Sequence, residues 1–289
     1  MLHFDPDRPA AEPRDAATLV LLRDGPSAVE VFCVKRHERS GFLGGAVVFP
    51  GGKVDATDRD TAWLAHCTLP RPAAFAPDAD ALRALAVAAC RETLEEAAML
   101  PVVGEALAHD ELLSLRKAVA GEKGALLSAL AARRMRVDLA ALWPLARWIT
   151  PAPETRRYDT RFFAAAVGAG QRGAHDERET TASFWAPPAE VLSRFDVGEI
   201  QLAPPTHRTL AQLTGLSRAA DVAEAAARAC LDPICPRLVR QNTDDGETLA
   251  LALPGDPEHD VREARAPGPS RFVLRGGRWY PQDAPPVTH

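Results

Sequence analysis

The segment "RETLEEAAML" (residues 91–100) places Glu92, Glu95 and Glu96 within five positions of a stretch that is otherwise rich in alanine and leucine. On a helix these three side chains project within roughly 100° of one another. Like charges four residues apart destabilise a helix by about 0.2–0.5 kcal/mol, so helix stability alone does not explain the cluster. The opposite side carries an apolar stripe: Val87, Cys90, Leu94 and Ala97. We therefore expect a helix that packs by its apolar side and presents carboxylates to a cation.

Composition bounds the class of protein. The chain has 289 residues, enough for one large domain or two small ones, with 46% hydrophobic and 25% charged residues as in ordinary soluble proteins. A net charge of −5 disfavours a nucleic-acid-binding surface, and five cysteines without framework spacing are typical of free thiols in a reducing compartment. The sequence shows no signal-peptide pattern and no apolar run of 18 residues. We expect a cytoplasmic protein with no membrane or nucleic-acid partner, and a homodimer stays open.

Strand and helix patterns are interspersed along the chain. Two apolar runs separated by a turn signal predict a hairpin of strands at 16–23 and 29–36. Further strands are expected at 46–49, 145–150, 160–167 and 182–186, and helices over 80–99, in two pieces of 109–135 and from Thr206. The proline-rich tail after residue 235 shows only two short strand patterns, 248–253 and 270–275. Together these elements indicate a mixed α/β sandwich.

A glycine turn precedes the glutamate helix. The segment "FPGG" (residues 49–52) ends one of the expected strands, and its glycines let the backbone approach a ligand closely. Phosphoryl chemistry with hard divalent cations needs rigidly held carboxylate oxygens and free positions for water and phosphate oxygens. The glycine turn and the glutamates together supply both requirements.

These two segments resemble the Nudix box, whose pattern is Gly-x5-Glu-x7-Arg-Glu-U-x-Glu-Glu-x-Gly-U with U an apolar residue. Residues 91–96 match its core, and Gly51-Gly52 match its glycines. Three positions depart from the pattern: Asp58 stands where glutamate is expected, Thr93 replaces an apolar residue, and Ala98 replaces glycine. In addition, 38 residues (53–90) separate Gly52 from Arg91, where the pattern has 13. The box is therefore interrupted between Asp58 and the helix.

An interrupted box is similar to that of the Nudix branch typified by mammalian coenzyme A diphosphatase, which segments 40–60, 147–163 and 200–213 also resemble. The resemblance implies a Nudix-type α/β/α sandwich with a mixed sheet, a helical insertion and an irregular C-terminal tail. The resulting division of the chain is a Nudix domain over 1–235, insertions at about 59–79 and 105–142, and an extension over 236–289 packed on the domain.

The resemblance further implies hydrolysis, dependent on Mg²⁺ or Mn²⁺, of a nucleoside diphosphate linked to another moiety. Glu95 and Glu96 are the expected principal metal ligands, and Glu92 is expected to share a metal or to accept a proton from the attacking water. Arg91 would orient these carboxylates through ion pairs, and the carbonyl of Gly51 would add a ligand. A Nudix-fold sensor that has lost catalysis is the alternative, which the complete set of glutamates disfavours.

Two further groups of residues are candidates for the site. Glu177 and Glu179 precede an expected strand, where Nudix enzymes often place one more acid facing the metals; an exposed loop is the alternative reading. The candidates for substrate binding are Gly52, Arg36, Arg156 and Arg157. Each arginine taken alone is more readily a surface charge than a phosphate ligand.

The interrupted-box resemblance implies that the substrate is coenzyme A or an acyl-CoA, cleaved to 3′,5′-ADP and phosphopantetheine or its acyl ester. Such a substrate needs a cationic site for the 3′-phosphate, expected at Arg156 and Arg157, and an apolar channel for the pantetheine arm, expected along 109–135. ADP-ribose or a dinucleotide is the alternative, which needs aromatic side chains for stacking. The stacking candidates are Tyr158, Phe162, Phe163, Phe184 and Trp185.

Overall fold

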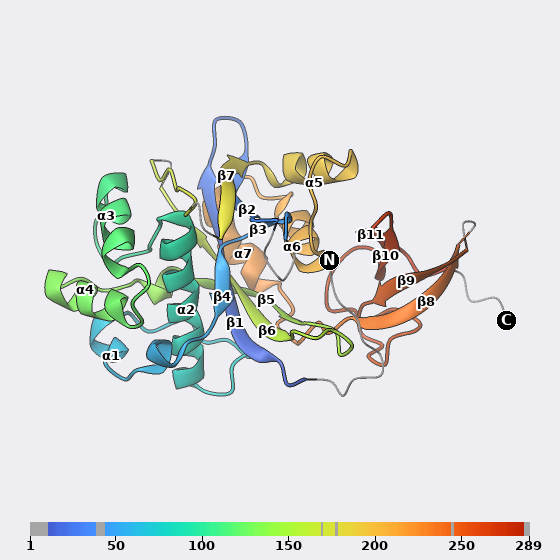
Figure 1. Cartoon of the computed structure of the whole chain (residues 1–289), viewed down its shortest axis with the longest axis horizontal. Helices are drawn as coiled ribbons and strands as arrows, with labels where there is room; N and C mark the ends of the chain where they lie inside the picture. Colours follow the sequence, from blue (N-terminus) through green and yellow to red (C-terminus); the bar gives the residue numbers. More distant parts are fainter. Residues whose placement is uncertain (1–10, 39–43, 169, 177–178, 244–245, 286–289) are drawn as a thin grey trace.

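A seven-stranded mixed sheet forms the centre of the molecule in the computed structural model, which describes residues 11–38, 44–168, 170–176, 179–243 and 246–285 (Figure 1). Its strands are β1 (Arg14–Asp24), β2 (Val29–Arg36), β3 (Val47–Val48), β4 (Gly51–Lys53), β5 (Trp143–Ile149), β6 (Tyr158–Ala166) and β7 (Thr180–Ala186). The strand order is β3-β2-β1-β6-β5, with β4 pairing to β1 and β7 pairing to β2. The predicted hairpin is thus the β1–β2 pair.

β1 is buried on both faces of this sheet. It pairs antiparallel with β2 and parallel with β6, from Arg14↔Tyr158 to Leu22↔Ala166. Leu19 and Leu21 enter one apolar cluster and Val20 enters the other, and all three side chains are fully buried. Because both faces are covered, β1 appears in the sequence as a continuous apolar run rather than as an alternating one.

Helices cover both faces of the sheet. One face carries α1 (Trp63–His66), α2 (Ala79–Ala97), α3 (His109–Val119) and α4 (Ala125–Arg133), together with the 3₁₀ turns η1 (Ala56–Arg59) and η2 (Leu139–Ala141). The other face carries α5 (Pro188–Asp196), α6 (Pro204–Leu213) and α7 (Val222–Ala227), with η3 (Ala219–Asp221). This arrangement confirms the predicted α/β/α sandwich with a mixed sheet. No helix in the described part of the chain is both long and apolar enough to cross a membrane.

α2 is the helix that the glutamate segment predicts. It begins after Asp78, whose side chain accepts a hydrogen bond from the backbone N–H of Ala81 at 2.7 Å, and it ends at Ala97, followed by Ala98 in the left-handed region with φ 50°. Its residues from Leu82 to Cys90 are buried all round the helix, which corrects the one-sided packing that we expected. The reason is that α1, α3 and α4 pack beside α2, on the side away from the sheet (Figure 1).

The two segments expected as insertions contact each other. The backbone N–H of Val137 donates to the carbonyl of His66 at 2.9 Å, and Thr68 Oγ1 donates to Asp138 Oδ1 at 2.9 Å. Residues 59–79, which contain the helix α1, are therefore held in place by residues of the 105–142 segment.

The C-terminal extension is more regular than the expected tail. It forms a second, four-stranded sheet from β8 (Arg237–Thr243), β9 (Gly246–Ala252), β10 (Arg271–Arg275) and β11 (Arg278–Gln282), in the order β11-β10-β9-β8. The sequence predicted only β9 and β10. In Figure 1 this sheet lies at the opposite end of the molecule from α3 and α4.

Candidate active site

The glycine turn and the glutamate helix meet, because β4 lies directly against α2. The backbone N–H of Gly51 donates a hydrogen bond to Glu96 Oε2 at 3.0 Å. A Cβ atom added at Gly52 would lie 2.5 Å from the carboxyl group of Glu92, and one added at Gly51 would lie 2.5 Å from the carbonyl oxygen of Ala17. Glycine is therefore required at Gly51 by close approach to the backbone of β1, and at Gly52 it leaves room for the carboxyl group of Glu92.

Arg91 is held by a buried carboxylate. Its guanidinium donates to both oxygens of Asp58, at 2.9 and 3.0 Å, and Asp58 is only 1% exposed. The same guanidinium donates to Glu92 Oε1 at 2.8 Å and to the carbonyl of Lys53 at 3.0 Å. Asp58, one of the three residues that depart from the family pattern, thus forms a bidentate pair with Arg91, and Arg91 in turn orients Glu92.

The three glutamates concentrate negative charge in a poorly solvated place. Burial, reinforced by the nearby charge of Glu92, raises the pKa of Glu96 to about 8. Burial also raises the pKa of Glu92 to about 7, although Arg91 opposes this shift. The pKa of Glu95 is raised by burial as well, although its side chain is the most exposed of the three at 42%. A bound cation would stabilise the charged forms of all three groups.

The donor set fits a hard divalent cation. All three groups supply carboxylate oxygens, and Mg²⁺ commonly takes one or two protein carboxylates while phosphate oxygens and waters complete its shell. Within the described ranges, no three or more His, Cys, Asp or Glu side chains are arranged so that they could hold a metal ion by themselves. Glu92 and Glu95 line the cavity described below, whereas Glu96 is 3% exposed and is bonded to the N–H of Gly51. A substrate phosphate would therefore have to complete the metal shell, and the Gly51 carbonyl stays a predicted ligand.

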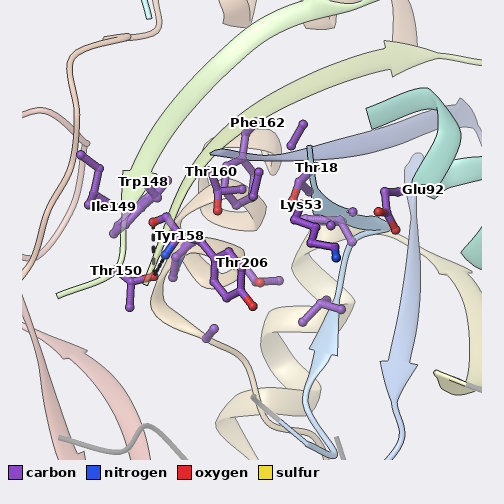
Figure 2. Close-up of a pocket in the computed structure, with 18 of the residues that line it drawn as sticks. Thr18, Lys53, Glu92, Trp148, Ile149, Thr150, Tyr158, Thr160, Phe162 and Thr206 are labelled. Carbon is purple, nitrogen blue, oxygen red and sulfur yellow. Dashed lines mark hydrogen bonds between the residues drawn. The ribbon is translucent and has the colours of Figure 1, made fainter. Parts of the chain in front are cut away.

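A cavity of about 460 Å³ opens beside these carboxylates and changes in character along its length. Its charged lining residues are Arg36, Lys53, Asp55, Arg91, Glu92, Glu95 and Glu179. Its large apolar lining residues are Val48 and Phe49 before the glycine turn and, elsewhere, Trp148, Ile149, Pro151, Phe162, Pro204, Pro205, Pro236 and Leu251. Figure 2 shows Lys53 and Glu92 on one side of the cavity, with Trp148 and Ile149 on the other. The cavity thus has a charged end and an apolar end.

Arg36 is a cation at the charged end. Its side chain lies close enough to Glu96 to lower the pKa of that carboxyl, against the larger effect of burial. Its Nε atom is buried and has no hydrogen-bond partner in the described part of the chain. Because an unpaired buried donor is costly, an anionic oxygen bound in the cavity would stabilise it.

Of the two further acids, Glu179 lines the cavity, and its charge is one of those that raise the pKa of Glu92. The backbone of Glu179 is fixed, because its N–H donates to the carboxylate of Asp176 and its carbonyl accepts from the N–H of His37 at 2.9 Å. Glu177 lies outside the described residues.

Arg156 and Arg157 are not among the described residues that line the cavity, although they were expected to bind phosphate there. Arg157 donates to the backbone carbonyls of Thr150 at 3.0 Å and Ala11 at 2.7 Å, and Arg156 is exposed. Their segment connects β5 to β6. The structure thus places neither arginine at the charged end of the cavity, and their binding of a phosphate stays a prediction.

The helical segment 109–135 likewise does not form the apolar wall. The structure describes all of its residues, none of them lines the cavity, and α3 and α4 lie beyond α2 as seen from the sheet (Figure 1). The apolar wall comes instead from β5 and β6, from the start of α6 and from the C-terminal extension.

Of the five stacking candidates, Tyr158 and Phe162 line the cavity and three do not. Phe163 points to the other face of the sheet, where it packs against Phe75, because successive residues of a strand alternate in direction. Phe184 lies under Arg194, and Trp185 contacts Phe32. Trp148 also lines the cavity and was missed. It pairs with Thr160 across β5 and β6, so only the strand register would have revealed it.

Comparison with known proteins gives consistent results. A family model described as the NUDT19 Nudix domain matches residues 70–213. The acyl-coenzyme A diphosphatase NUDT19 of Gallus gallus is 31% identical over 278 residues, covering 80% of this chain and 73% of that protein. The same-named protein of Homo sapiens is 30% identical, but the match covers only 61% of its length and 65% of this chain. A crystal structure of a NUDIX hydrolase from Alicyclobacillus acidocaldarius is 32% identical with a TM-score of 0.65, covering 74% of this chain and 96% of that one.

Proposed function

The chain belongs to the Nudix hydrolase family and is a Nudix pyrophosphohydrolase, and we propose that it cleaves the diphosphate of coenzyme A or an acyl-CoA. The products would be 3′,5′-ADP and phosphopantetheine or its acyl ester. Two similar proteins carry the name acyl-coenzyme A diphosphatase, which supports this substrate class. The observation that carries the proposal is the cavity, since it joins a carboxylate-rich end to an apolar end.

The charged end has groups suited to each part of the hydrolysis. Glu92, Glu95 and Glu96 would hold Mg²⁺ or Mn²⁺, which supplies charge neutralisation at the diphosphate and acidifies water. Glu92 would share this metal or accept the proton of the attacking water, since its carboxylate lines the cavity beside Glu95. Arg91, fixed by Asp58, keeps the carboxylate of Glu92 in place.

The phosphate oxygens would be bound by the remaining cations at the charged end. Arg36 offers a buried donor without a described partner, and Lys53 makes only a long contact of 3.5 Å with Asp55 while its side chain stays half exposed. Both residues line the cavity next to the glutamates. With Arg156 and Arg157 outside the cavity, Lys53 becomes the candidate ligand for a 3′-phosphate.

ADP-ribose is a second candidate substrate, favoured by a specific observation. Trp148, Tyr158 and Phe162 place three aromatic rings around the cavity, and such rings can stack on a nucleobase. ADP-ribose has neither a 3′-phosphate nor a pantetheine arm, so its binding would require neither a 3′-phosphate site nor an acyl channel.

The test is a substrate panel with the purified chain in Mg²⁺ or Mn²⁺. We expect coenzyme A or an acyl-CoA to be hydrolysed with release of 3′,5′-ADP, and to have a higher kcat/KM than ADP-ribose or a dinucleoside polyphosphate. Coenzyme A and dephospho-coenzyme A should differ about tenfold if Lys53 binds the 3′-phosphate, and the Lys53→Met variant should reduce that ratio. Faster hydrolysis of ADP-ribose would overturn the proposed substrate and leave the Nudix chemistry standing.

A further inference from the structure

The C-terminal sheet contributes to the wall of the active-site cavity. Pro236 and Leu251 both line it, at the apolar end that also contains Trp148 and Phe162. Both residues lie beyond residue 213, where the match to the family model stops. The apolar end of the cavity is therefore completed by a part of the chain that the family match does not include.

Pro236 is held in place by backbone pairing with β5. The N–H of Ile149 donates to the carbonyl of Ile234 at 2.9 Å, and the N–H of Ile234 donates to the carbonyl of Arg147 at 2.8 Å. These two bonds make the chain around Ile234 a short parallel neighbour of β5, which itself supplies Trp148 and Ile149 to the cavity. The entry into the C-terminal sheet is thus fixed against the wall of the site.

Leu251 is a well-supported part of the same wall. It is 1% exposed, and on its two sides it pairs with Leu238 of β8 and Phe272 of β10. Its side chain belongs to one apolar cluster with Trp148 and Phe162. Because protein interiors are close-packed, a change of volume at Leu251 changes the space available at this end of the cavity.

We propose that the C-terminal sheet, β8 to β11, is the specificity element of this enzyme, and that Leu251 limits the length of the apolar group that the substrate carries beyond its diphosphate. For an acyl-CoA this group is the pantetheine arm with its acyl chain. The inference rests on the proposed function for the identity of the substrate. It does not depend on the metal ligands, which α2 supplies from the other end of the cavity.

The experiment compares Leu251→Ala with Leu253→Ala across coenzyme A and acyl-CoA substrates of increasing chain length. Leu253 is the matched control, since it is equally buried at 3% exposed in the same cluster but is not among the described residues lining the cavity. We expect Leu251→Ala to raise kcat/KM for long acyl chains relative to free coenzyme A by about tenfold, because the removed carbons vacate space for the substrate. Leu253→Ala should lower the melting temperature to a similar extent and leave that ratio as in the unmodified protein.

A second variant keeps the test decisive if Leu251→Ala folds poorly. Leu251→Phe fills the apolar end, so it should shift the same ratio in the opposite direction, towards free coenzyme A and short chains. An unchanged ratio in both Leu251 variants, or an equal change in the Leu253 control, would overturn the inference. If the unmodified protein does not cleave coenzyme A, the proposed function fails separately, and the ratio is then measured between small and large groups on whichever diphosphate it does cleave.

Discussion

Glu96 is more deeply buried than Glu92 and Glu95, so its ionised form loses the most hydration of the three. Its carboxylate accepts the N–H of Gly51, and burial together with Glu92 raises its pKa to about 8. We expect Glu96→Gln to keep the fold, because the amide oxygen can still accept the bond from Gly51. The melting temperature should stay equal or rise, since a neutral amide avoids a buried charge. We expect kcat to fall by about 100-fold or more, measured as release of the monophosphate product.

The matched control for this variant is Glu247→Gln. Glu247 pairs with Arg240 on the surface of the C-terminal sheet, where both side chains are more than half exposed. Neither kcat nor the melting temperature should change there. Near-normal turnover in Glu96→Gln would remove Glu96 from the catalytic site.

The raised pKa values of Glu92 and Glu96 predict how the stability of the metal-free protein depends on pH. Both groups bind protons more tightly in the folded state, with pKa values of about 7 and about 8 against the ordinary value of 4.5 for a glutamate. Their contribution to the free energy of unfolding is therefore complete below about pH 4.5 and is lost as the pH rises through 7 to 8. Without metal, the melting temperature should fall between pH 5 and pH 8.

Adding Mg²⁺ or Mn²⁺ should reverse this loss, and the increase in melting temperature should be larger at pH 8 than at pH 5.5 because the cation binds the ionised carboxylates. Thermal unfolding with EDTA or with metal measures both effects. Glu96→Gln should show a weaker pH dependence without metal. A melting temperature that is independent of both pH and metal would contradict this account of the carboxylates.

Asp58 stands where the family pattern has glutamate, and its shorter carboxylate still forms an ion pair with Arg91. It is almost fully buried and forms two hydrogen bonds with Arg91, so Asp58→Asn removes the most buried of the carboxylates that balance this guanidinium and leaves Glu92, at 2.8 Å, as its nearest counter-charge. We expect a loss of about 3 kcal/mol in the free energy of unfolding, measured by denaturant titration, against less than about 0.5 kcal/mol for Glu247→Gln. We also expect kcat to fall, because Arg91 then no longer fixes Glu92. Equal losses of stability in the two variants would rule out a structural role for the Asp58 pair.

At the scale of elements, β4 and α2 approach so closely that two adjacent glycines have different functions. A Cβ at Gly51 would meet the backbone of β1, namely the carbonyl of Ala17 and the Cα of Thr18 at 2.8 Å. A Cβ at Gly52 would meet only the end of the Glu92 side chain. We expect Gly51→Ala to lower the free energy of unfolding by about 2–3 kcal/mol, since a backbone cannot move aside cheaply. Gly52→Ala should instead reduce kcat more than stability, because it displaces the carboxylate of Glu92, for which we propose a role in catalysis.

Denaturant titrations of Gly51→Ala and Gly52→Ala measure the free energy of unfolding, and steady-state kinetics on the same variants measure kcat. If Gly52→Ala keeps full turnover, Glu92 does not need the position that it has in this structure.

Elements with strong local signals were predictable from the sequence, and elements that depend on distant partners were not. The β1–β2 hairpin and α2 have an apolar run and a capping Asp78 that reveal them locally, and α6 was predicted too, although it begins at Pro204 without a side-chain cap rather than at Thr206. β8 and β11 were missed. β11 contains Pro281, which disfavours a strand assignment and is tolerated because β11 is an edge strand.

The same distinction holds within the site. The glutamates share one helical turn, so their spacing shows that they cluster. Trp148 and Leu251 reach the cavity through strand register and through the docking of a second sheet, neither of which leaves a local pattern. Arg157 shows the converse, since a basic segment resembling the family binds backbone carbonyls instead of lining the cavity.

At the scale of the whole molecule, the active-site cavity spans two sheets. The central sheet and α2 supply the charged end, and the C-terminal sheet completes the apolar end. The C-terminal sheet is also tied to the other elements by Arg208 of α6, whose guanidinium donates to the carbonyls of Pro267 and Pro269. Substrate binding should therefore depend on how firmly the second sheet is held together and docked.

Arg271 and Asp256 test that dependence from inside the C-terminal sheet. They form a buried pair, 1% and 0% exposed, with hydrogen bonds of 2.8 Å from Nε and 2.6 Å from Nη2. Removing one partner leaves the other charge buried, so Arg271→Met should lower the free energy of unfolding by about 3–5 kcal/mol, and adding Asp256→Asn should recover part of that loss.

Arg271 lies in β10 and Asp256 in the connection that precedes it, whereas the glutamates proposed to bind metal lie on α2, so loosening the second sheet should act on substrate binding rather than on chemistry. We expect Arg271→Met, assayed below its melting temperature, to raise KM for an acyl-CoA several-fold while kcat stays within about twofold. The double variant should bring KM back towards that of the unmodified protein. A fall in kcat at constant KM would instead place the effect of the second sheet at the carboxylate end, since only that end takes part in cleavage of the diphosphate.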